Sequence, residues 1–292
     1  MSGRIRRVAI LGHRRRPGVR RAAAALRARL ARRRIEVRIE EALATTLGVE
    51  GHSLGALASW CELLVTLGGD GTVLSGARAL AGKRGALLPV NLGGLGFLTV
   101  ADGRGLAAAV NAVLAGRWPV ARRRVVTAAI RRRGRQVRTG VAMNDVVIKG
   151  AGGYAALHLE VSALGSDVGH LVADGLIAAS AAGSTAYSLS AGGPVLAPDL
   201  DALVLTPACP HSLGSRSLVL PAGAEVEVRL LGSSDHCLVL FDGQDAADLE
   251  TGDQVRMRLD RMVVRVYQNP ARPFMRSLQT KLGWQGSEQR SL

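Results

Sequence analysis

One short stretch around residue 70 constrains the fold more than any other part of the chain. Residues 63–67 form a continuous apolar run of buried-strand length, and the apolar residues from Val73 onward recur at helical spacing. The turn between them reads Gly68-Gly69-Asp70-Gly71-Thr72. Glycines at a strand-to-helix turn allow positive φ and close backbone approach, and the N–H groups that begin the helix attract anions. We therefore expect these three glycines and Thr72 to form a phosphate-binding turn.

Asp70 is the unusual residue of this turn, because a carboxylate beside bound phosphates repels them unless it has another task. Two tasks fit: accepting a proton from an attacking hydroxyl, or holding a metal that bridges phosphates. The plainer alternative is a Gly-Asp-Gly turn whose aspartate caps the following helix. The whole pentapeptide after a buried strand is more specific than the tripeptide alone, so we predict Asp70 to be functional.

Strands and helices are expected to alternate through the first 118 residues. A second glycine-rich turn at residues 91–98 follows another short apolar strand, residues 86–90. This alternation is typical of a doubly wound parallel sheet with ligand-binding loops at the carboxyl ends of its strands. We predict an N-terminal α/β domain over residues 1–118, with both glycine turns along one edge and a less regular connection at residues 42–59.

The pattern changes near Pro119, where short β-branched runs begin. They cover residues 125–130, 137–148, 157–161, 203–206, 226–230, 238–241, 255–259 and 263–266, with expected hairpin turns at 133–135 and 232–234. We therefore predict an α+β two-domain chain whose residues 119–270 form an all-β, sandwich-like domain. Its one helical interruption is expected near residues 184–191. Residues 271–292 carry apolar side chains at helical spacing and are expected to pack back on the protein.

Composition limits the classes of partner. The net charge is +15, with 35 arginines against 3 lysines, but aromatic residues make up only 3% of the chain. That is too few for a base-stacking platform, so we expect anionic small molecules as ligands, and no nucleic acid. No apolar run is long enough to span a bilayer or to serve as a signal peptide, so we expect a cytoplasmic protein without a membrane partner. Three cysteines without CxxC spacing are expected to be free thiols.

Polar residues interrupt the apolar runs of the second half at three places. The first is Asn144-Asp145, where a carboxylate could accept both hydroxyls of a ribose and an amide could read an adenine edge. Adjacent strand residues point to opposite faces, so one pocket receives both only where the strand bends or ends. An ordinary Asn-Asp turn is an equally good interpretation of this pair alone.

The second place begins at Asp174 and continues through residues 180–194, where hydroxyls are dense among small residues. A helix start of this composition could bind ribose and base, with Tyr187 lying flat on the base. A tightly packed small-residue helix is the alternative, but it leaves the hydroxyls unexplained. The third place is Asp242-Gly243-Gln244, which as a lone motif is most often a hairpin turn. His211 lies in a proline-containing loop, and no pair of histidines has metal-ligand spacing.

These motifs occur together and in order between Val8 and Trp284. They are Gly68-Gly69-Asp70-Gly71-Thr72, Asn91-Leu92-Gly93-Gly94-Leu95-Gly96-Phe97-Leu98, Asn144-Asp145, Asp174-Gly175-Leu176, Gly183-Ser184-Thr185-Ala186-Tyr187-Ser188 and Asp242-Gly243-Gln244. In this combination they closely resemble the NAD kinase family. Related lipid kinases share the glycine-aspartate turn but not the segment that starts at Gly183.

The resemblance implies transfer of phosphate from ATP, or from polyphosphate in some members, to the 2′-hydroxyl of the adenosine ribose of NAD, giving NADP. It matches Asp70 to the family's proton acceptor, with Gly71 beside it in the substrate site. The other substrate-binding positions it implies are Asn144 and Asp145 for adenine and ribose, Asp174 for the nicotinamide half, Thr185, Ala186, Tyr187, Ser188, Leu189 and Ser190 for adenosine, and Gln244 near the same pocket. It also implies a homodimer or homotetramer, and magnesium or manganese that arrives on the donor phosphates and not in a protein cage.

The chain departs from the family pattern before Gly183. The family usually has Thr-Pro-Thr where this chain has Ser180-Ala181-Ala182, so a hydroxyl expected to bind the dinucleotide is missing at Ala182. Some members also carry an arginine at the position of Val172. A lost hydrogen bond of this kind costs about 0.5–1.5 kcal/mol, which weakens binding without touching the proton acceptor.

Two other functions compete with the kinase. One is a non-catalytic dinucleotide-binding protein that has lost turnover, and the other is a lipid kinase. Asp70 and Asn144-Asp145 favour the enzyme, because a pure binder gains nothing from a buried carboxylate beside phosphates. The absence of a membrane-binding stretch counts against the lipid kinase.

Overall fold

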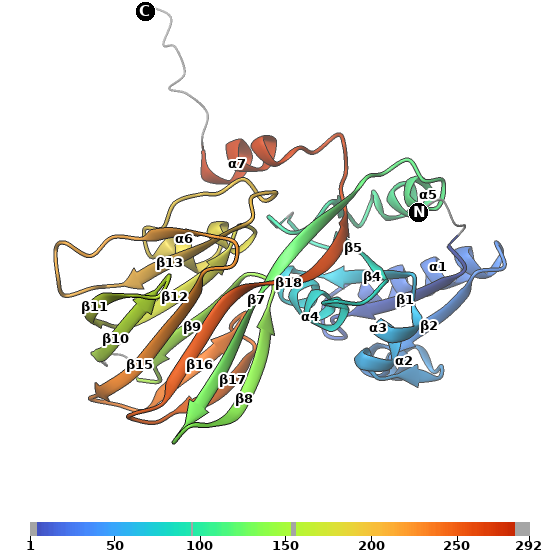
Figure 1. Cartoon of the computed structure of the whole chain (residues 1–292). Coiled ribbons are helices and arrows are strands. Elements are labelled where there is room, and N and C mark those ends of the chain that lie inside the picture. Colours follow the sequence, from blue (N-terminus) through green and yellow to red (C-terminus); the bar gives the residue numbers. More distant parts are fainter. Residues whose placement is uncertain (1–4, 95, 153–155, 284–292) are drawn as a thin grey trace, which may run out of the picture. The chain divides into compact units, whose positions relative to one another are not determined.

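The computed structural model describes residues 5–94, 96–152 and 156–283 (Figure 1). The chain divides into two compact units. The first comprises the described parts of Met1–Gly76, Arg84–Ala121 and Arg265–Leu292, and the second those of Ala77–Lys83 and Arg122–Val264. Leu95 of the second glycine turn and Trp284 lie outside the described residues. Among the helices described, none has both the length and the apolar character to cross a membrane.

A parallel sheet forms the centre of the first unit, with the strand order β5-β4-β1-β2-β3. The strands are β1 (Arg7–Gly12), β2 (Glu36–Glu40), β3 (Gly51–His52), β4 (Leu63–Gly68) and β5 (Ala86–Asn91), and β6 (Ala101–Asp102) pairs with β5. The helices are α1 (Val19–Ala31), α2 (Glu41–Leu47), α3 (Leu54–Trp60), α4 (Asp70–Leu80), α5 (Leu106–Leu114) and α7 (Phe274–Leu282). Every residue of β4 and β5 is buried, as expected of apolar runs at the centre of a parallel sheet.

Helix α1 shows how one face of a helix joins this core while the others stay polar. Its buried residues are Val19, Ala23, Leu26 and Leu30, each at most 2% exposed. They belong to one apolar cluster with side chains of β1 and β4. Burial of such a stripe is what holds a helix on a sheet, so the arginines of α1 are left on its solvent-facing sides.

The winding of the sheet reverses between β1 and β4. From β1 the chain continues to β2 and β3 on one side, whereas β4 and β5 lie on the other. The loops after β1 and β4 therefore flank the point at which open α/β sheets bind their ligands. The loop after β4 is the predicted phosphate turn, and the loop after β1 contains Arg14, Arg15 and Arg16.

Two sheets form the second unit (Figure 1). One contains, in order, β11 (Ser166–Ala173), β10 (Leu157–Ala163), β15 (Glu225–Ser233), β18 (Gln254–Tyr267), β7 (Val120–Arg132) and β8 (Arg135–Ala142). The other contains β14 (Leu218–Pro221), β13 (Ala202–Ala208), β12 (Gly175–Ser180), β9 (Asp145–Gly150), β16 (Cys237–Phe241) and β17 (Asp245–Leu249). Side chains from both sheets form one apolar cluster that includes Phe241, the largest of the fully buried side chains that the structure describes. The predicted fold class, an α/β domain followed by a sandwich-like β-domain, is confirmed.

Two short helices replace the irregular connection expected at residues 42–59. The Glu40 side chain accepts from the N–H groups of Ala42 and Leu43, which caps α2, and Ser53 caps α3 through the N–H of Ala56. Helices of 7 residues are too short to give a clear period, so the prediction for this stretch was wrong.

Several strand predictions also need correction. The run 137–148 is two strands, β8 and β9, which lie in different sheets. Residues 232–234 do not form a hairpin, because β15 and β16 also lie in different sheets. The runs 255–259 and 263–266 belong to the single strand β18. The strand β12 was not among the expected runs. The helical interruption expected near residues 184–191 is present as the helical turns η1 (Gly183–Thr185) and α6 (Tyr187–Ser190).

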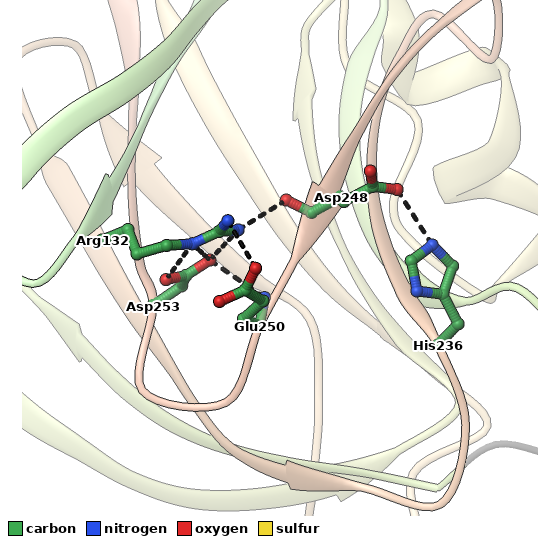
Figure 2. Close-up of polar contacts among 5 residues, drawn as sticks. All are labelled: Arg132, His236, Asp248, Glu250 and Asp253. Atoms are coloured by element: carbon green, nitrogen blue, oxygen red, sulfur yellow. Dashed lines mark hydrogen bonds and ion pairs between the residues drawn. The ribbon is translucent and has the colours of Figure 1, made fainter.

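A polar cluster holds the turn between β17 and β18 against the end of β7 (Figure 2). The guanidinium of Arg132 donates to both carboxylate oxygens of Asp253, with a shortest distance of 2.9 Å, and pairs with Glu250 at 2.6 Å. The same guanidinium donates to the Asp248 carbonyl, and the Asp248 carboxylate lies 2.9 Å from Nε2 of His236. The Asp253 side chain is only 2% exposed, so the ion pair with Arg132 compensates for a buried charge.

Candidate functional site

The predicted phosphate turn joins β4 to α4. Gly68 ends the strand and Asp70 begins the helix. None of Gly68, Gly69 and Gly71 has a positive φ, so this turn does not use the freedom of φ that glycine allows. Close approach explains the first two: a Cβ at Gly68 would collide with Thr72, and a Cβ at Gly69 would lie 2.6 Å from Nη1 of Arg16. These glycines leave room for side chains that gather at the turn.

The Asp70 carboxylate is placed in a confined position. Its Oδ1 atom is buried and has no hydrogen-bond partner among the described residues. Gly96, from the second glycine turn, lies so close that a Cβ there would collide with the carboxylate. Burial raises the pKa of Asp70 above its usual value, and the charges of Lys281 and Arg16 partly oppose this effect. The carboxyl is therefore a stronger proton acceptor than an exposed aspartate.

Arg16 lies between the two glycine turns, and the sequence did not single it out. Its guanidinium occupies the space beside Gly69 and also the space where a Cβ at Gly93 would be. It has no ion-pair partner among the described residues. A planar guanidinium with free N–H groups binds phosphate oxygens in pairs, so Arg16 adds a cation to the glycine turns.

Lys281 brings a second cation from the other end of the chain. It lies in the last turn of α7, with Nζ 5.6 Å from the centre of the Phe97 ring, and its charge lowers the pKa of Asp70. The tail helix predicted only to pack back on the protein therefore also supplies charge near Asp70.

The sequence held a signal for one of these cations but not for the other. Three arginines follow the first strand of a predicted doubly wound sheet, and the loop after that strand flanks the ligand-binding point. Arg16 could have been found this way. Lys281 sits on the polar face of a terminal helix, where no local pattern separates it from a solvated lysine.

In the second unit, Asn144 and Asp145 lie at the beginning of β9 and are 8% and 5% exposed. The N–H groups of Met143, Asn144 and Asp145 all donate to the carboxylate of Asp242, at 3.0, 2.7 and 3.3 Å. By accepting these three hydrogen bonds, the Asp242 carboxylate holds the backbone at the start of β9 and fixes the position of Asn144 and Asp145. The Oδ1 atom of Asn144 is buried without a hydrogen-bond partner among the described residues, as Oδ1 of Asp70 is.

Asp145 carries the largest pKa shift of the predicted site. Burial and the nearby charge of Asp242 raise its pKa to about 7, although the backbone N–H of Tyr187 lowers it. Burial also raises the pKa of Asp242, and hydrogen bonds from Met143 and Asn144 oppose that shift. Asp145 therefore changes its charge near neutral pH.

The predicted adenosine segment packs against this pair. A Cβ at Gly183 would collide with the carbonyl of Asn144, so only glycine allows the two backbones to approach this closely. Ser180 ties them together, because its hydroxyl donates to the Met143 carbonyl at 2.6 Å and accepts from the N–H of Gly183 at 3.1 Å. Tyr187 is 44% exposed, and its backbone N–H bonds to Asp145. Thr185, Ala186, Leu189 and Ser190 lie in the same short helical turns, whereas Ser188 is buried and bonds to Thr206.

The two remaining predicted residues are placed differently. Gln244 lies on the turn between β16 and β17, where its Oε1 accepts from Arg78 at 2.8 Å. Asp174 is exposed and precedes β12 at the opposite end from Ser180. Six residues of extended chain separate them by about 20 Å, so the strand does not bring Asp174 to the Asn144-Asp145 pair.

Comparisons with known proteins agree with this architecture. The model of the ATP-NAD kinase N-terminal domain matches residues 8–118, and that of the ATP-NAD kinase C-terminal domain matches residues 143–267. An NAD kinase of Desulforamulus reducens is 39% identical over 77% of this chain and 79% of its own length. An NAD kinase of Syntrophotalea carbinolica is 36% identical over 86% and 89% of the two chains.

Two solved structures share the fold. The crystal structure of yeast NADH kinase complexed with NADH superposes with a TM-score of 0.91 at 24% identity, covering 100% of this chain and 91% of that one. An NAD kinase from Archaeoglobus fulgidus, in complex with ATP, gives a TM-score of 0.75 at 22% identity, with 95% and 97% coverage. The family models cover most of the chain and the relatives exceed 30% identity over most of its length. The chain therefore belongs to the NAD kinase family.

Proposed function

We propose that the protein transfers the terminal phosphate of ATP, or of polyphosphate, to the 2′-hydroxyl of the adenosine ribose of NAD and so makes NADP. Membership of the NAD kinase family supports the activity. The observation that carries the mechanism is the buried Oδ1 of Asp70, which has no partner in the described structure and lies in the predicted phosphate turn. A buried oxygen without a partner costs about 1–3 kcal/mol, so its presence indicates that a ligand completes it.

In this mechanism Asp70 accepts the proton of the ribose hydroxyl. The new bond forms between the hydroxyl oxygen and the terminal phosphorus of the donor, while the bond from that phosphorus to its bridging oxygen breaks. The bridging oxygen leaves with the shortened donor and its electron pair. General-base help of this kind typically contributes about 10²–10⁴ in rate.

Positive groups compensate for the charge of the transferred phosphate. The N–H groups at the start of α4 would face the anion, and Arg16 and Lys281 would add two full charges close to Asp70. These cations also lower the pKa of Asp70 and so favour its ionised form, which a proton acceptor requires.

The dinucleotide is recognised mainly in the second unit. Asn144 has a free buried amide oxygen that could accept the amino group of adenine, and the ionised Asp145 could accept ribose hydroxyls. Thr185 to Ser190, with Tyr187 exposed for stacking, would complete the adenosine site. Asp174 would contact the nicotinamide half, at a distance that suits an extended dinucleotide or a site shared between subunits of a homodimer or homotetramer.

The residues present suit a divalent cation that arrives with the donor. No group of three or more metal-binding side chains occurs among the described residues, so a cation is expected to bind mainly through donor phosphates, and Asp70 in the predicted phosphate turn could supply a carboxylate oxygen. Magnesium or manganese bound there would spread the charge of the transferred phosphate.

A direct assay tests the proposal. Purified protein is incubated with NAD, ATP and magnesium, and NADP is detected with a dehydrogenase that accepts only NADP. We expect product from the native chain and at least a 100-fold loss of turnover, about the lower limit for a general base, in Asp70→Asn. NAD binding should be nearly unchanged in this variant.

Two outcomes would contradict the proposal. No product at high enzyme concentration, together with intact NAD binding, would favour a non-catalytic binder. An Asp70→Asn variant with unimpaired turnover would remove this residue from the mechanism.

A further inference from the structure

A cavity of about 810 Å³ in the first unit is not used by the mechanism above. One wall is α1 with the residue after it, which contribute Arg21, Arg29 and Arg32, and the facing wall is the segment that carries Arg104. Alanines and glycines make up much of the remaining lining, and none of the described residues that line it is aromatic. We call this cavity the arginine groove.

The charges of the groove are not neutralised within the described structure. Arg21, Arg32 and Arg104 are exposed and have no carboxylate partner among the described residues. Arg29 is held by Asn111, whose Oδ1 lies 3.3 Å from its Nε. Asp102 is the acidic residue among the described lining residues, and its carboxylate accepts from the N–H of Gly105 at 2.7 Å. The groove therefore presents several separate cations to one elongated space.

The groove also begins beside the glycine turns. Gly93 lines it, and the guanidinium of Arg16 lies against the same residue. From Arg21 to Arg32 the helix rises by about 16 Å, so the cations are spread along the groove and not gathered at one point. Spread cations, without an aromatic side chain among the described lining residues, suit a chain of phosphates better than a nucleoside.

We propose that the arginine groove binds the distal phosphates of linear inorganic polyphosphate, so that a donor longer than a triphosphate extends from the glycine turns along α1. The inference deepens the proposed function, on which it rests, by assigning a separate subsite to this class of donor. We expect tripolyphosphate and ATP, which are shorter, to gain little from the groove.

Two double variants of equal charge test this inference. Arg21→Gln/Arg32→Gln removes two cations of the groove, and Arg27→Gln/Arg33→Gln removes two exposed cations of the same helix and its following turn that do not line it. Glutamine is a good helix former, and matching thermal unfolding of both variants would show that the fold is retained. Binding of long-chain polyphosphate and of tripolyphosphate is then measured by calorimetry at one salt concentration.

We expect the groove variant to lose about tenfold or more in affinity for long-chain polyphosphate, with tripolyphosphate binding unchanged and the control variant within about twofold of the native chain. An equal loss in both variants would show a general charge effect and overturn the proposal. An equal loss of tripolyphosphate binding would overturn the separate subsite. A single-stranded oligonucleotide that binds as tightly and is lost in the same variant would show a nucleic-acid surface instead.

The kinase assay separates this inference from the proposed function. If the native chain makes no NADP from ATP or from polyphosphate, the proposed function fails, whatever the binding experiments show. If it makes NADP from both, the groove variant should raise the KM for polyphosphate and leave the KM for ATP unchanged. An unchanged KM for polyphosphate would contradict the role proposed for the arginine groove and leave the proposed function intact.

Discussion

Arg78 and Asp242 form an ion pair in which Nη1 of the arginine lies 3.2 Å from Oδ2 of a fully buried carboxylate. The same carboxylate holds the backbone of Asn144 and Asp145. The arginine therefore keeps a buried charge in place, and that charge in turn positions the predicted dinucleotide-binding pair.

Replacing Arg78 with glutamine should disturb this arrangement without touching Asp145 directly. We expect a loss of about 3 kcal/mol in unfolding free energy, because breaking a buried ion pair leaves one charge without a partner. The KM for NAD should rise, because Asp145 then faces a less compensated Asp242. Urea unfolding and steady-state kinetics measure the two effects, with the exposed Arg84→Gln as the control. A change in neither quantity would show that the pair is not needed to position Asp145.

The activity should fall at low pH with the protonation of Asp70. Burial raises the pKa of this carboxyl, and Arg16 lowers it, so the acidic limb of kcat/KM should lie above the usual aspartate range. Arg16→Gln should move that limb to higher pH and raise the KM for the donor. Arg15→Gln, an exposed neighbour in the same loop, should change neither. Identical pH profiles in the native chain and Arg16→Gln would show that Arg16 does not affect the pKa of Asp70.

The ionisation of Asp145 should lower the stability of the folded chain as the pH rises. Its pKa in the folded chain is about 7, above the ordinary value of 3.8, so its contribution is favourable below pH 3.8 and is lost progressively towards pH 7. Asp145→Asn should therefore gain thermal stability relative to the native chain between pH 5 and pH 8, while losing NAD affinity. Melting curves at the two pH values measure the difference. A constant difference would mean that Asp145 does not titrate in this range.

Arg132 should stabilise the second unit without affecting catalysis. Its contact with the buried Asp253 connects the end of β7 to the turn before β18 (Figure 2). Arg132→Leu should reduce the unfolding free energy by about 3 kcal/mol and leave the KM for NAD and for ATP unchanged. His236→Ala, at the exposed edge of the cluster, should cost much less, because exposed pairs contribute little. Equal losses of unfolding free energy in the two variants would show that the whole cluster, and not the contact between Arg132 and Asp253, stabilises the unit.

The elements that sequence predicted well are those whose whole pattern is local. The apolar run at β4, the stripe of α1 and the spacing of α7 each require only neighbouring residues, and all three elements are present. The strand β12 was missed because its small residues gain their burial from β9 and β13, which lie far away in the sequence.

The same distinction applies to the site. Motifs such as the glycine turn and Asn144-Asp145 are contiguous in sequence and could be named in advance. Arg16 and Lys281 reach Asp70 from distant parts of the chain, and Asp242 acts by accepting backbone N–H groups almost 100 residues away. These relationships depend on tertiary packing, which no short segment encodes. The boundaries proposed for the domains, at residues 118 and 270, remain predictions.

Gly96 carries no chemistry, yet the Asp70 carboxylate fills the space where its side chain would be. A methyl group at this position would displace the Asp70 carboxylate, and we expect the parallel sheet to stay folded. In a selection for NADP supply, a library covering every codon should therefore tolerate substitution at this glycine as poorly as at the aspartate, even among variants that accumulate normally in the cell.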